Sequence, residues 1–533
     1  MRMNLRNLGG WVLAGALTVS GLHAAAALDM QLIDAVRRGD RDMVRRMIQS
    51  DASAVNRPAG DGATALLWSA YRNDTETASL LLGAGANPNA ANDYGVTPLS
   101  LACTNKNVPL VEMLVKAKAN SNAAETNGVT PLMNCAKTGT IEAVKILIAA
   151  GANLDAADTD RAQTALMRAA AQKHSAVVQA LVAAKANVHL RTKKLDLYDP
   201  MKAITYSDKA YFPGEKGGFT ALMFAAQSGD VDAAKALLDA GAKIDDGTEF
   251  DGTPLVVAAQ NGNEKVSLFL LDRGASPNAR DGYGLTPMHW ALQEGLAELF
   301  GGGKSMTDKF WVRSNSPELV KALLARNADP NAEMTNDFMP YEVHRFARSM
   351  GNNLPQLYLS GVTPFMLATA SGDVATMRFL VERRADPKIT TGQGTTPLMV
   401  ASGIGREREP RTEDEKKRFL EAMKLNVMLG GDVNAVDKNG RTALHGAVYL
   451  GDLDMIEFLV KNGANLEWKD KYGQTPITIA MGDPGGLVYR QLKGDAFDYS
   501  FRQPARENKG TAELLLKLGA KPYDGPIRDR SAE

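Results

Sequence analysis

The chain repeats one short pattern at a nearly constant interval of about 33 residues. Each copy opens with a threonine, followed by proline or alanine and then by a large apolar residue. The opening threonines are Thr64, Thr97, Thr130, Thr164, Thr220, Thr253, Thr286, Thr363, Thr396, Thr442 and Thr475, spaced by 33, 33, 34, 56, 33, 33, 77, 33, 46 and 33 residues. This period indicates a stacked array in which each unit packs on its neighbours. Such an array can exceed the roughly 250–300 residues at which a single core stops growing.

The copy that begins at Thr97 predicts how one unit folds. Thr97 can accept hydrogen bonds from the amides of a first helical turn, and Pro98 suits the first helical position, where no N–H is needed. Apolar residues at helical spacing follow in two segments, residues 99–103 and 110–115. Glycine in runs such as residues 85–87 can adopt the left-handed conformation that ends a helix. Each unit is therefore predicted to be a pair of short helices, with a tight turn leading to the next pair.

These units resemble the ankyrin repeat family. The family's Gly-containing turn before Thr-Pro-Leu-His is matched by residues 284–289 and 440–445, and its Gly-Ala-x-Pro-Asn segment is matched by residues 274–278. The resemblance covers nearly all of residues 31–522. It implies an all-α solenoid of about twelve helix-turn-helix units with short hairpin connectors and several insertions.

The chain departs from the family pattern at one position. The family's histidine is kept only in two copies, and the other copies hold Leu, Ser, Met, Val or Thr there. The two retained histidines are His289 and His445. The hydrogen bonds that this histidine makes in the family must therefore be absent or replaced in the other units.

The first residues lack the repeat pattern. Arg2 and Arg6 precede a short apolar run over residues 11–19, and small residues at 24–27 offer a cleavage site. This order is typical of a secretory signal peptide, which we assign to residues 1–27. The apolar run is shorter than the roughly 20 residues that span a bilayer, so we expect no membrane insertion after signal removal. The mature chain is expected to be exported, to the periplasm or out of the cell.

Breaks in the period divide the rest of the chain into three blocks. We predict a regular array with an N-terminal cap at residues 28–191, and arrays with two insertions each at residues 218–360 and 361–524, the last of these ending in a C-terminal cap. The expected insertions are residues 192–217, 295–316, 336–359, 406–417 and 482–508, and residues 525–533 form a polar tail. Most insertions carry aromatic residues, which are scarce in the repeats and typical of interface hot spots. The alternative is that these insertions pack against the repeats.

Charge and motifs argue against nucleic-acid binding and catalysis. The 61 basic and 61 acidic residues cancel, so no net charge attracts a nucleic acid or an anionic membrane. None of the six histidines is followed by the glutamate of a zinc-protease helix. A loose set of ionisable residues does not supply an acid, a base and a nucleophile together; it comprises His289, Asp308, His344 and Arg345. We predict no catalytic residue, no metal site and no cofactor.

The two cysteines, Cys103 and Cys135, lie in successive units, one residue out of phase. In an oxidising compartment they could form a disulfide, provided that their Cα atoms lie within about 7 Å. The alternative, which we favour, is that both are small buried thiols in positions that alanine fills elsewhere.

The predicted function is the binding of a protein partner by a monomer. In a stacked array the first helices line the concave face and the connectors project along one edge. The candidate contacts are Asn92, Asp93, Tyr94, Asp281, Tyr283, Lys438, Asn439, Lys471 and Tyr472 on connectors, and Tyr211, Phe212 and Trp311 in insertions. Resemblance to exported ankyrin proteins also suggests an accessory or maturation factor for a periplasmic redox enzyme. Further alternatives are a host-targeted effector and an enzyme with a pocket formed by insertions within residues 295–359.

Overall fold

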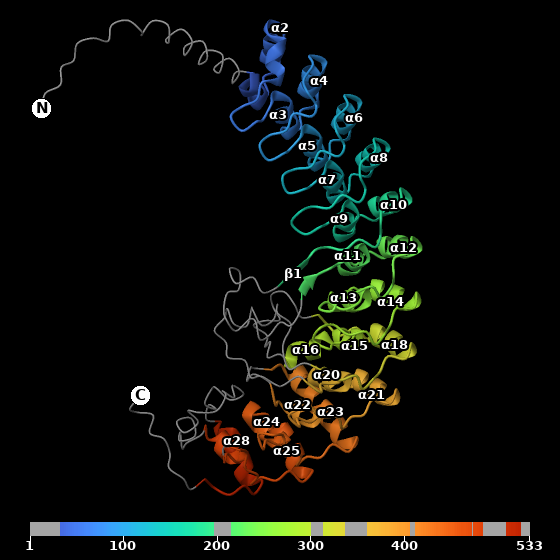
Figure 1. Cartoon of the computed structure of the whole chain (residues 1–533). Coiled ribbons are helices and arrows are strands. Elements are labelled where there is room, and N and C mark those ends of the chain that lie inside the picture. Colours follow the sequence, from blue (N-terminus) through green and yellow to red (C-terminus); the bar gives the residue numbers. More distant parts are fainter. Residues whose placement is uncertain are drawn as a thin grey trace, which may run out of the picture. The chain divides into compact units, whose positions relative to one another are not determined.

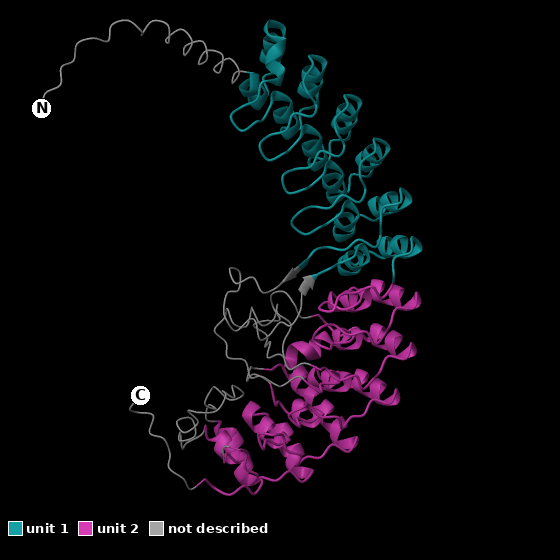
Figure 2. Cartoon of the chain, viewed as in Figure 1, with its two compact units in different colours: residues 1–194, 217–243 teal, residues 195–216, 244–533 magenta. Residues whose placement is uncertain are grey.

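A computed structural model of the chain describes residues 32–196, 215–299, 313–335, 360–405, 411–471, 473–482 and 508–523 (Figure 1). These residues form paired α-helices, which confirms the predicted all-α repeat array. The chain divides into two compact units, coloured separately in Figure 2. Unit 1 comprises residues 1–194 and 217–243, and unit 2 comprises residues 195–216 and 244–533. The predicted block 218–360 is therefore shared between the two units.

Unit 1 consists of two layers of short helices (Figure 1). The inner layer contains α3 (Ala65–Tyr71), α5 (Pro98–Thr104), α7 (Pro131–Thr138), α9 (Ala165–Ala171) and α11 (Ala221–Ser228). The outer layer contains α2 (Arg41–Ser50), α4 (Thr75–Gly83), α6 (Val108–Lys116), α8 (Ile141–Ala149), α10 (Ser175–Ala183) and α12 (Val231–Asp239). Residues 32–38 are also helical and precede α2, and the 3₁₀ turn η1 (Ala52–Asn56) follows it. Within the unit, each of these helices contacts its equivalent in the neighbouring repeat.

Unit 2 has the same two layers. Its inner helices are α13 (Pro254–Gln260), α15 (Pro287–Ala291), α20 (Pro364–Ala370), α22 (Pro397–Ala401), α24 (Ala443–Leu450) and α26 (Pro476–Ala480). Its outer helices are α14 (Glu264–Asp272), α18 (Pro317–Ala325), α21 (Val374–Glu382), α23 (Glu413–Met428), α25 (Leu453–Lys461) and α28 (Lys509–Lys517). An additional helix, α16 (Gln293–Leu299), follows α15 and packs on α20.

Three predicted insertions contain regular structure at their edges. Residues 295–299 belong to α16, and residues 413–417 form the start of α23, so both insertions are shorter than expected. In the segment 192–217, the short strands β1 (Lys194–Asp196) and β2 (Glu215–Gly217) pair with each other. The predicted insertions at 336–359 and 482–508 lie almost entirely outside the described residues.

The opening threonines define the starts of the inner helices. Every one of them is a helix N-cap, and in most repeats its hydroxyl accepts from the amide three residues later, as Thr97 does from Ser100 at 3.2 Å. In several repeats, the residue at the position of the family's histidine accepts a hydrogen bond from the amide of the N-cap threonine. His289 Nδ1 accepts from the amide of its N-cap threonine at 3.1 Å, and the hydroxyl of Thr478 makes the equivalent contact at 2.9 Å. The histidine's hydrogen bond is thus replaced at Thr478, as expected.

The favoured interpretation of the two cysteines is wrong. Cys103 and Cys135 form a disulfide, and their Cα atoms lie 4.5 Å apart. They lie on neighbouring inner helices, α5 and α7, and both side chains are fully buried. The small residues of the inner layer allow these helices to approach closely enough for the bond. Among the described residues, no helix has the length and apolar character needed to cross a membrane.

Candidate functional site

The connectors between repeats form a row of stacked turns, which we call fingers. Each finger closes on itself through a backbone hydrogen bond, such as that from the amide of Asn92 to the carbonyl of Val96 at 3.1 Å. A hydrogen bond from a backbone amide of one finger to a backbone carbonyl of the preceding turn joins successive fingers. In the part of the chain that the structure describes, the fingers include residues 59–63, 92–96, 125–129 and 158–163 in unit 1, and residues 281–285, 391–395, 437–441 and 470–474 in unit 2.

An acidic side chain at the start of several fingers holds the finger against an inner helix. Asp158 forms an ion pair with Arg168 of α9 at 2.9 Å, and both side chains are mostly buried. Asp281 accepts from Nε1 of Trp290 on α15 at 2.8 Å. Glu125 accepts from Asn134 of α7 at 3.1 Å. Because these bonds join the finger to its helix, the fingers are rigid extensions of the inner layer.

Two predicted contact residues are buried, and their assignment as surface contacts is wrong. Asp281 is 8% exposed and Tyr283 is 6% exposed. Burial raises the pKa of the Asp281 carboxyl to about 6, although it accepts from the amides of Tyr283 and Leu285, both at 2.9 Å, and from Trp290. The ring of Tyr283 packs edge-on against Phe250, with centroids 5.5 Å apart. In this finger Asp281 and Tyr283 therefore stabilise the fold from buried positions.

The equivalent finger of unit 1 exposes its predicted residues. Tyr94 is 69% exposed, and Asp93 is exposed beside it. Asn92 is half-buried, and its Oδ1 accepts from the amides of Tyr94 and Val96 at 3.1 and 2.9 Å. Asn92 therefore shapes the turn, whereas Asp93 and Tyr94 are accessible. That these two residues bind a partner stays a prediction.

The predicted residues of the last two fingers lie together. Lys438 and Lys471 are exposed, and Asn439 is half-buried. The amide of Lys471 donates to the carbonyl of Asn439 at 2.8 Å, and its Nζ donates to the Asn439 side chain. The remaining predicted contacts lie outside the described residues; they are Tyr211, Phe212, Trp311 and Tyr472.

The inner face of unit 1 carries aromatic residues that the sequence reasoning missed. We define the inner face as the fourth and seventh residues of each inner helix. On α3 these are Trp68 and Tyr71, whose rings lie 5.4 Å apart, and Tyr71 is 64% exposed. The guanidinium of Arg37 stacks on Trp68, 4.3 Å from the ring centroid. The spacing of three residues between aromatics on a short helix could have revealed this pair, since such residues share a face.

In unit 2, other parts of the same unit lie against the inner helices α20 and α24. Helix α16 lies on α20 so closely that a Cβ on Gly295 would overlap the carbonyl oxygen of Leu367. Further along, a Cβ on Gly446 of α24 would be 2.9 Å from the carbonyl oxygen of Ser402, in the turn after α22. The covering segments are therefore in direct backbone contact with the inner helices.

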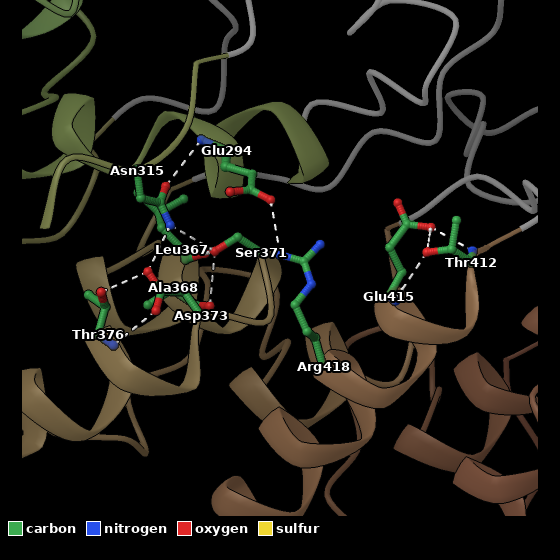
Figure 3. A network of polar contacts seen from close by, with 10 residues as sticks. All are labelled: Glu294, Asn315, Leu367, Ala368, Ser371, Asp373, Thr376, Thr412, Glu415 and Arg418. Carbon is green, nitrogen blue, oxygen red and sulfur yellow. Dashed lines mark hydrogen bonds and ion pairs between the residues drawn. The ribbon is translucent and has the colours of Figure 1, made fainter.

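Polar contacts fix α16 in this position, as Figure 3 shows. Asn315 accepts from the amide of Glu294 at 3.3 Å and donates to Ser371 and Asp373, both at 3.1 Å. Arg418 of α23 donates to the Glu294 carboxylate at 3.4 Å. One asparagine thus ties α16 to the end of α20 and the start of α21, and Arg418 ties it to α23.

The two repeat histidines have structural positions. His289 is fully buried, and burial lowers its pKa to about 4. His445 is equally buried, with a pKa of about 4 for the same reason. The other members of the loose ionisable set lie outside the described residues; they are Asp308, His344 and Arg345. In the part of the chain that the structure describes, no three metal-ligating side chains are grouped.

Family models match most of the array. A model of three ankyrin repeats matches residues 32–125, 109–192, 222–300 and 415–486, and a model of one ankyrin repeat matches residues 283–334 and 360–392. The chain belongs to the ankyrin repeat family. Ankyrin repeats are scaffolds for protein–protein interaction, and proteins built from them are generally not enzymes.

Curated relatives match short stretches of this ankyrin repeat protein. The probable 26S proteasome regulatory subunit p28 of Saccharomyces cerevisiae is 31% identical over 130 residues, which is 24% of this chain and 51% of p28. Human neurogenic locus notch homolog protein 1 is 31% identical over 121 residues, 22% of this chain and 4% of that protein. Mouse ankyrin repeat domain-containing protein 63 is 33% identical over 135 residues, 25% of this chain and 32% of that protein. The matches thus span about half or less of each relative.

Among solved structures, the ankyrin repeat domain of human ASB11 is similar to part of the chain. It has 22% sequence identity and a TM-score of 0.38, with 50% of this chain and 100% of that chain covered.

Proposed function

We propose that this ankyrin repeat protein is an exported scaffold that binds a protein partner through the fingers and the inner face of unit 1. The observation that carries the proposal is the exposure of aromatic residues on rigid structure. Tyr94 is held on a finger that is bonded to both neighbouring fingers, and Tyr71 lies on the inner face of α3. Large aromatic side chains on a preorganised backbone are typical of the residues that dominate interface energies.

Two observations support export. Residues 1–27 have the charge and apolar pattern of a signal peptide. The Cys103–Cys135 disulfide joins two buried positions, and structural disulfides persist mainly in oxidising compartments such as the periplasm or the extracellular space. A cytosolic location would leave both cysteines reduced.

The test is crosslinked affinity purification of the tagged exported protein, followed by mass spectrometry. We expect the double variant Tyr71→Ala/Tyr94→Ala to recover at least about tenfold less of the specific partner, as the loss of two hot-spot side chains would cause. The matched control is Met428→Ala, because Met428 is 66% exposed at the end of the outer helix α23.

Unchanged partner recovery by the tyrosine variant, with both variants equally folded, would reject this surface. An equal loss for Met428→Ala would reject it as well, because the partner would then depend on the outer layer of unit 2. Detection of the full-length protein only in the cytoplasm would reject export.

A further inference from the structure

Accessibility of the inner face differs between the two units. In unit 1 the fourth residue of every inner helix keeps exposed surface; these residues are Trp68, Leu101, Asn134, Arg168 and Phe224. In unit 2 the fourth residue of every described inner helix is buried; these residues are Val257, Trp290, Leu367, Val400, Gly446 and Ile479. Within the described residues, the fourth position of the inner helices is therefore accessible to a partner only in unit 1.

The first three fingers of unit 1 all carry negative charge. They contain Asp61, Asp93 and Glu125, and no lysine or arginine occurs in residues 59–63, 92–96 or 125–129. Asp61 and Asp93 are exposed, and neither forms an ion pair with another described residue. The amide of Asp93 donates to the carbonyl of Asp61 at 3.1 Å, so the two carboxylates are carried on adjoining turns. The last fingers of unit 2 differ, since they expose Lys438 and Lys471.

Aromatic rings accompany the first two of these fingers. Tyr94 extends from the second finger, and its carbonyl accepts from the amide of Thr126 in the third finger at 3.0 Å. Trp68 and Tyr71 lie on the first inner helix, and Arg37 already stacks on Trp68. Aromatic faces attract Lys and Arg side chains, and nearby carboxylates strengthen that preference.

We propose that the fingers and inner face around Asp61, Trp68, Tyr71, Asp93, Tyr94 and Glu125 bind an extended, Lys- and Arg-containing segment of the partner protein. The exposed carboxylates of Asp61 and Asp93 pair with the segment's charged ends, and the exposed ring of Tyr94 packs on its side-chain stems. The inference rests on the proposed scaffold function and adds the chemistry of the partner.

The dimensions fit a short segment. Neighbouring repeats lie about 8–10 Å apart, so three fingers span roughly 20 Å. An extended chain advances about 3.3 Å per residue, and about six or seven residues cover this distance. A peptide of about 12 residues is therefore long enough to contact all three fingers.

The experiment selects phage-displayed random peptides of about 12 residues on the oxidised full chain. We expect the selected peptides to be enriched in Lys and Arg relative to the starting library, and synthetic copies to bind more weakly as salt is raised. The variant Asp61→Asn/Asp93→Asn/Tyr94→Ala should bind these peptides at least about tenfold more weakly. The matched control Lys438→Gln/Lys471→Gln removes charge from the fingers of unit 2 and should bind them unchanged.

Four outcomes would overturn the inference: no enrichment of any peptide, selected peptides without excess basic residues, equal binding by the triple variant, or loss of binding by the lysine control. Salt-sensitive self-association that the lysine control abolishes would also overturn it, because the occupant would then be a second copy of the chain. The crosslinking experiment separates the two proposals. If it still recovers a partner whose binding depends on Tyr71 and Tyr94, these results overturn the basic segment and leave the proposed scaffold function intact.

Discussion

At residues 289 and 445 a buried imidazole ties the start of an inner helix to the next repeat. Nδ1 of His445 accepts from the amide of Thr442 at 3.1 Å, and Nε2 lies 3.2 Å from the carbonyl oxygen of Gln474. These partners assign a neutral ring with its proton on Nε2. In the Thr396 repeat a methionine fills the same position, and Met399 Sδ lies 3.5 Å from the amide nitrogen of Thr396. The repeat therefore tolerates an uncharged substitute that keeps the first contact and loses the second.

This arrangement predicts a pH dependence of stability. Burial lowers the pKa of His445 to about 4, against about 6.5 in the unfolded chain. The unfolded state therefore binds the proton first, so the stability that His445 contributes is present above pH 6.5 and is lost as pH falls through 4. We expect urea unfolding of unit 2 to lose about 2–3 kcal/mol from this residue between pH 7.5 and 4.5.

The matched variant is His445→Met, which copies the residue of the Thr396 repeat. It should be less stable than the wild type at pH 7.5 and closer to it at pH 4.5. A constant difference between the two proteins at both pH values would contradict the assigned cause.

Among the elements, α16 decides which face of unit 2 is accessible. It continues the chain beyond α15 and lies on α20, where Gly295 meets the carbonyl oxygen of Leu367. Only a glycine allows this approach, since a side chain would overlap the backbone of α20.

We therefore predict that Gly295→Ala destabilises unit 2 by about 1–3 kcal/mol, as overpacking of a close contact does. The control is Gly83→Ala in α4, where a Cβ would meet nothing within 4 Å; there alanine should stabilise the helix by up to about 1 kcal/mol. Thermal unfolding followed by circular dichroism measures both. Equal stability of the Gly295 variant and the wild type would contradict the close packing of α16.

The disulfide acts on neighbouring inner helices. It joins residues 32 apart in the sequence, on α5 and α7. By restricting the unfolded chain, a link across a loop of this length stabilises the fold by about 3–4 kcal/mol. We predict that Cys103→Ser/Cys135→Ser lowers the free energy of unfolding of unit 1 by this amount.

The control is to repeat the unfolding measurement after the disulfide has been reduced. Wild type and double variant should unfold at different urea concentrations when oxidised, and at closer concentrations after reduction. Identical midpoints for the oxidised proteins would contradict a bond between these cysteines.

Over the whole molecule the net charge is zero, but exposed charged side chains are distributed unevenly among the fingers. The first fingers carry exposed Asp61 and Asp93, whereas the last carry exposed Lys438 and Lys471. The chain's 61 basic and 61 acidic residues therefore say little about the partner, because binding depends on the local surface.

Export and oxidation should occur together. We predict that the protein expressed with residues 1–27 is recovered outside the cytoplasm without that segment and with no thiol that alkylation can label. A version lacking residues 2–27 should stay in the cytoplasm and label at both cysteines, because that compartment keeps thiols reduced. Mass spectrometry after alkylation counts the thiols. An exported protein with two labelled cysteines would contradict the link between compartment and disulfide.

The repeat architecture was predictable from the sequence because its signals are local. A threonine accepts from an amide three residues away, and a proline suits the first helical position; the threonine recurs at every repeat start, followed by proline or alanine. These interactions need only a few neighbouring residues, so helix starts such as Thr97 and Thr396 followed from the pattern alone. Asp93 and Tyr94 were also placed correctly on an exposed turn.

Burial and proximity required the tertiary structure. Tyr94 and Tyr283 hold equivalent places in their fingers, but only Tyr283 packs against Phe250 of the adjoining turn. Cys103 and Cys135 differ in phase by one residue, and only the approach of α5 and α7 brings them together. Gly295 meets Leu367 across 72 residues of sequence. The sequence alone thus determined the repeat period and the start of each inner helix through short-range hydrogen bonding. Which faces stay exposed was decided by long-range packing, because burial depends on neighbours that are distant in the chain.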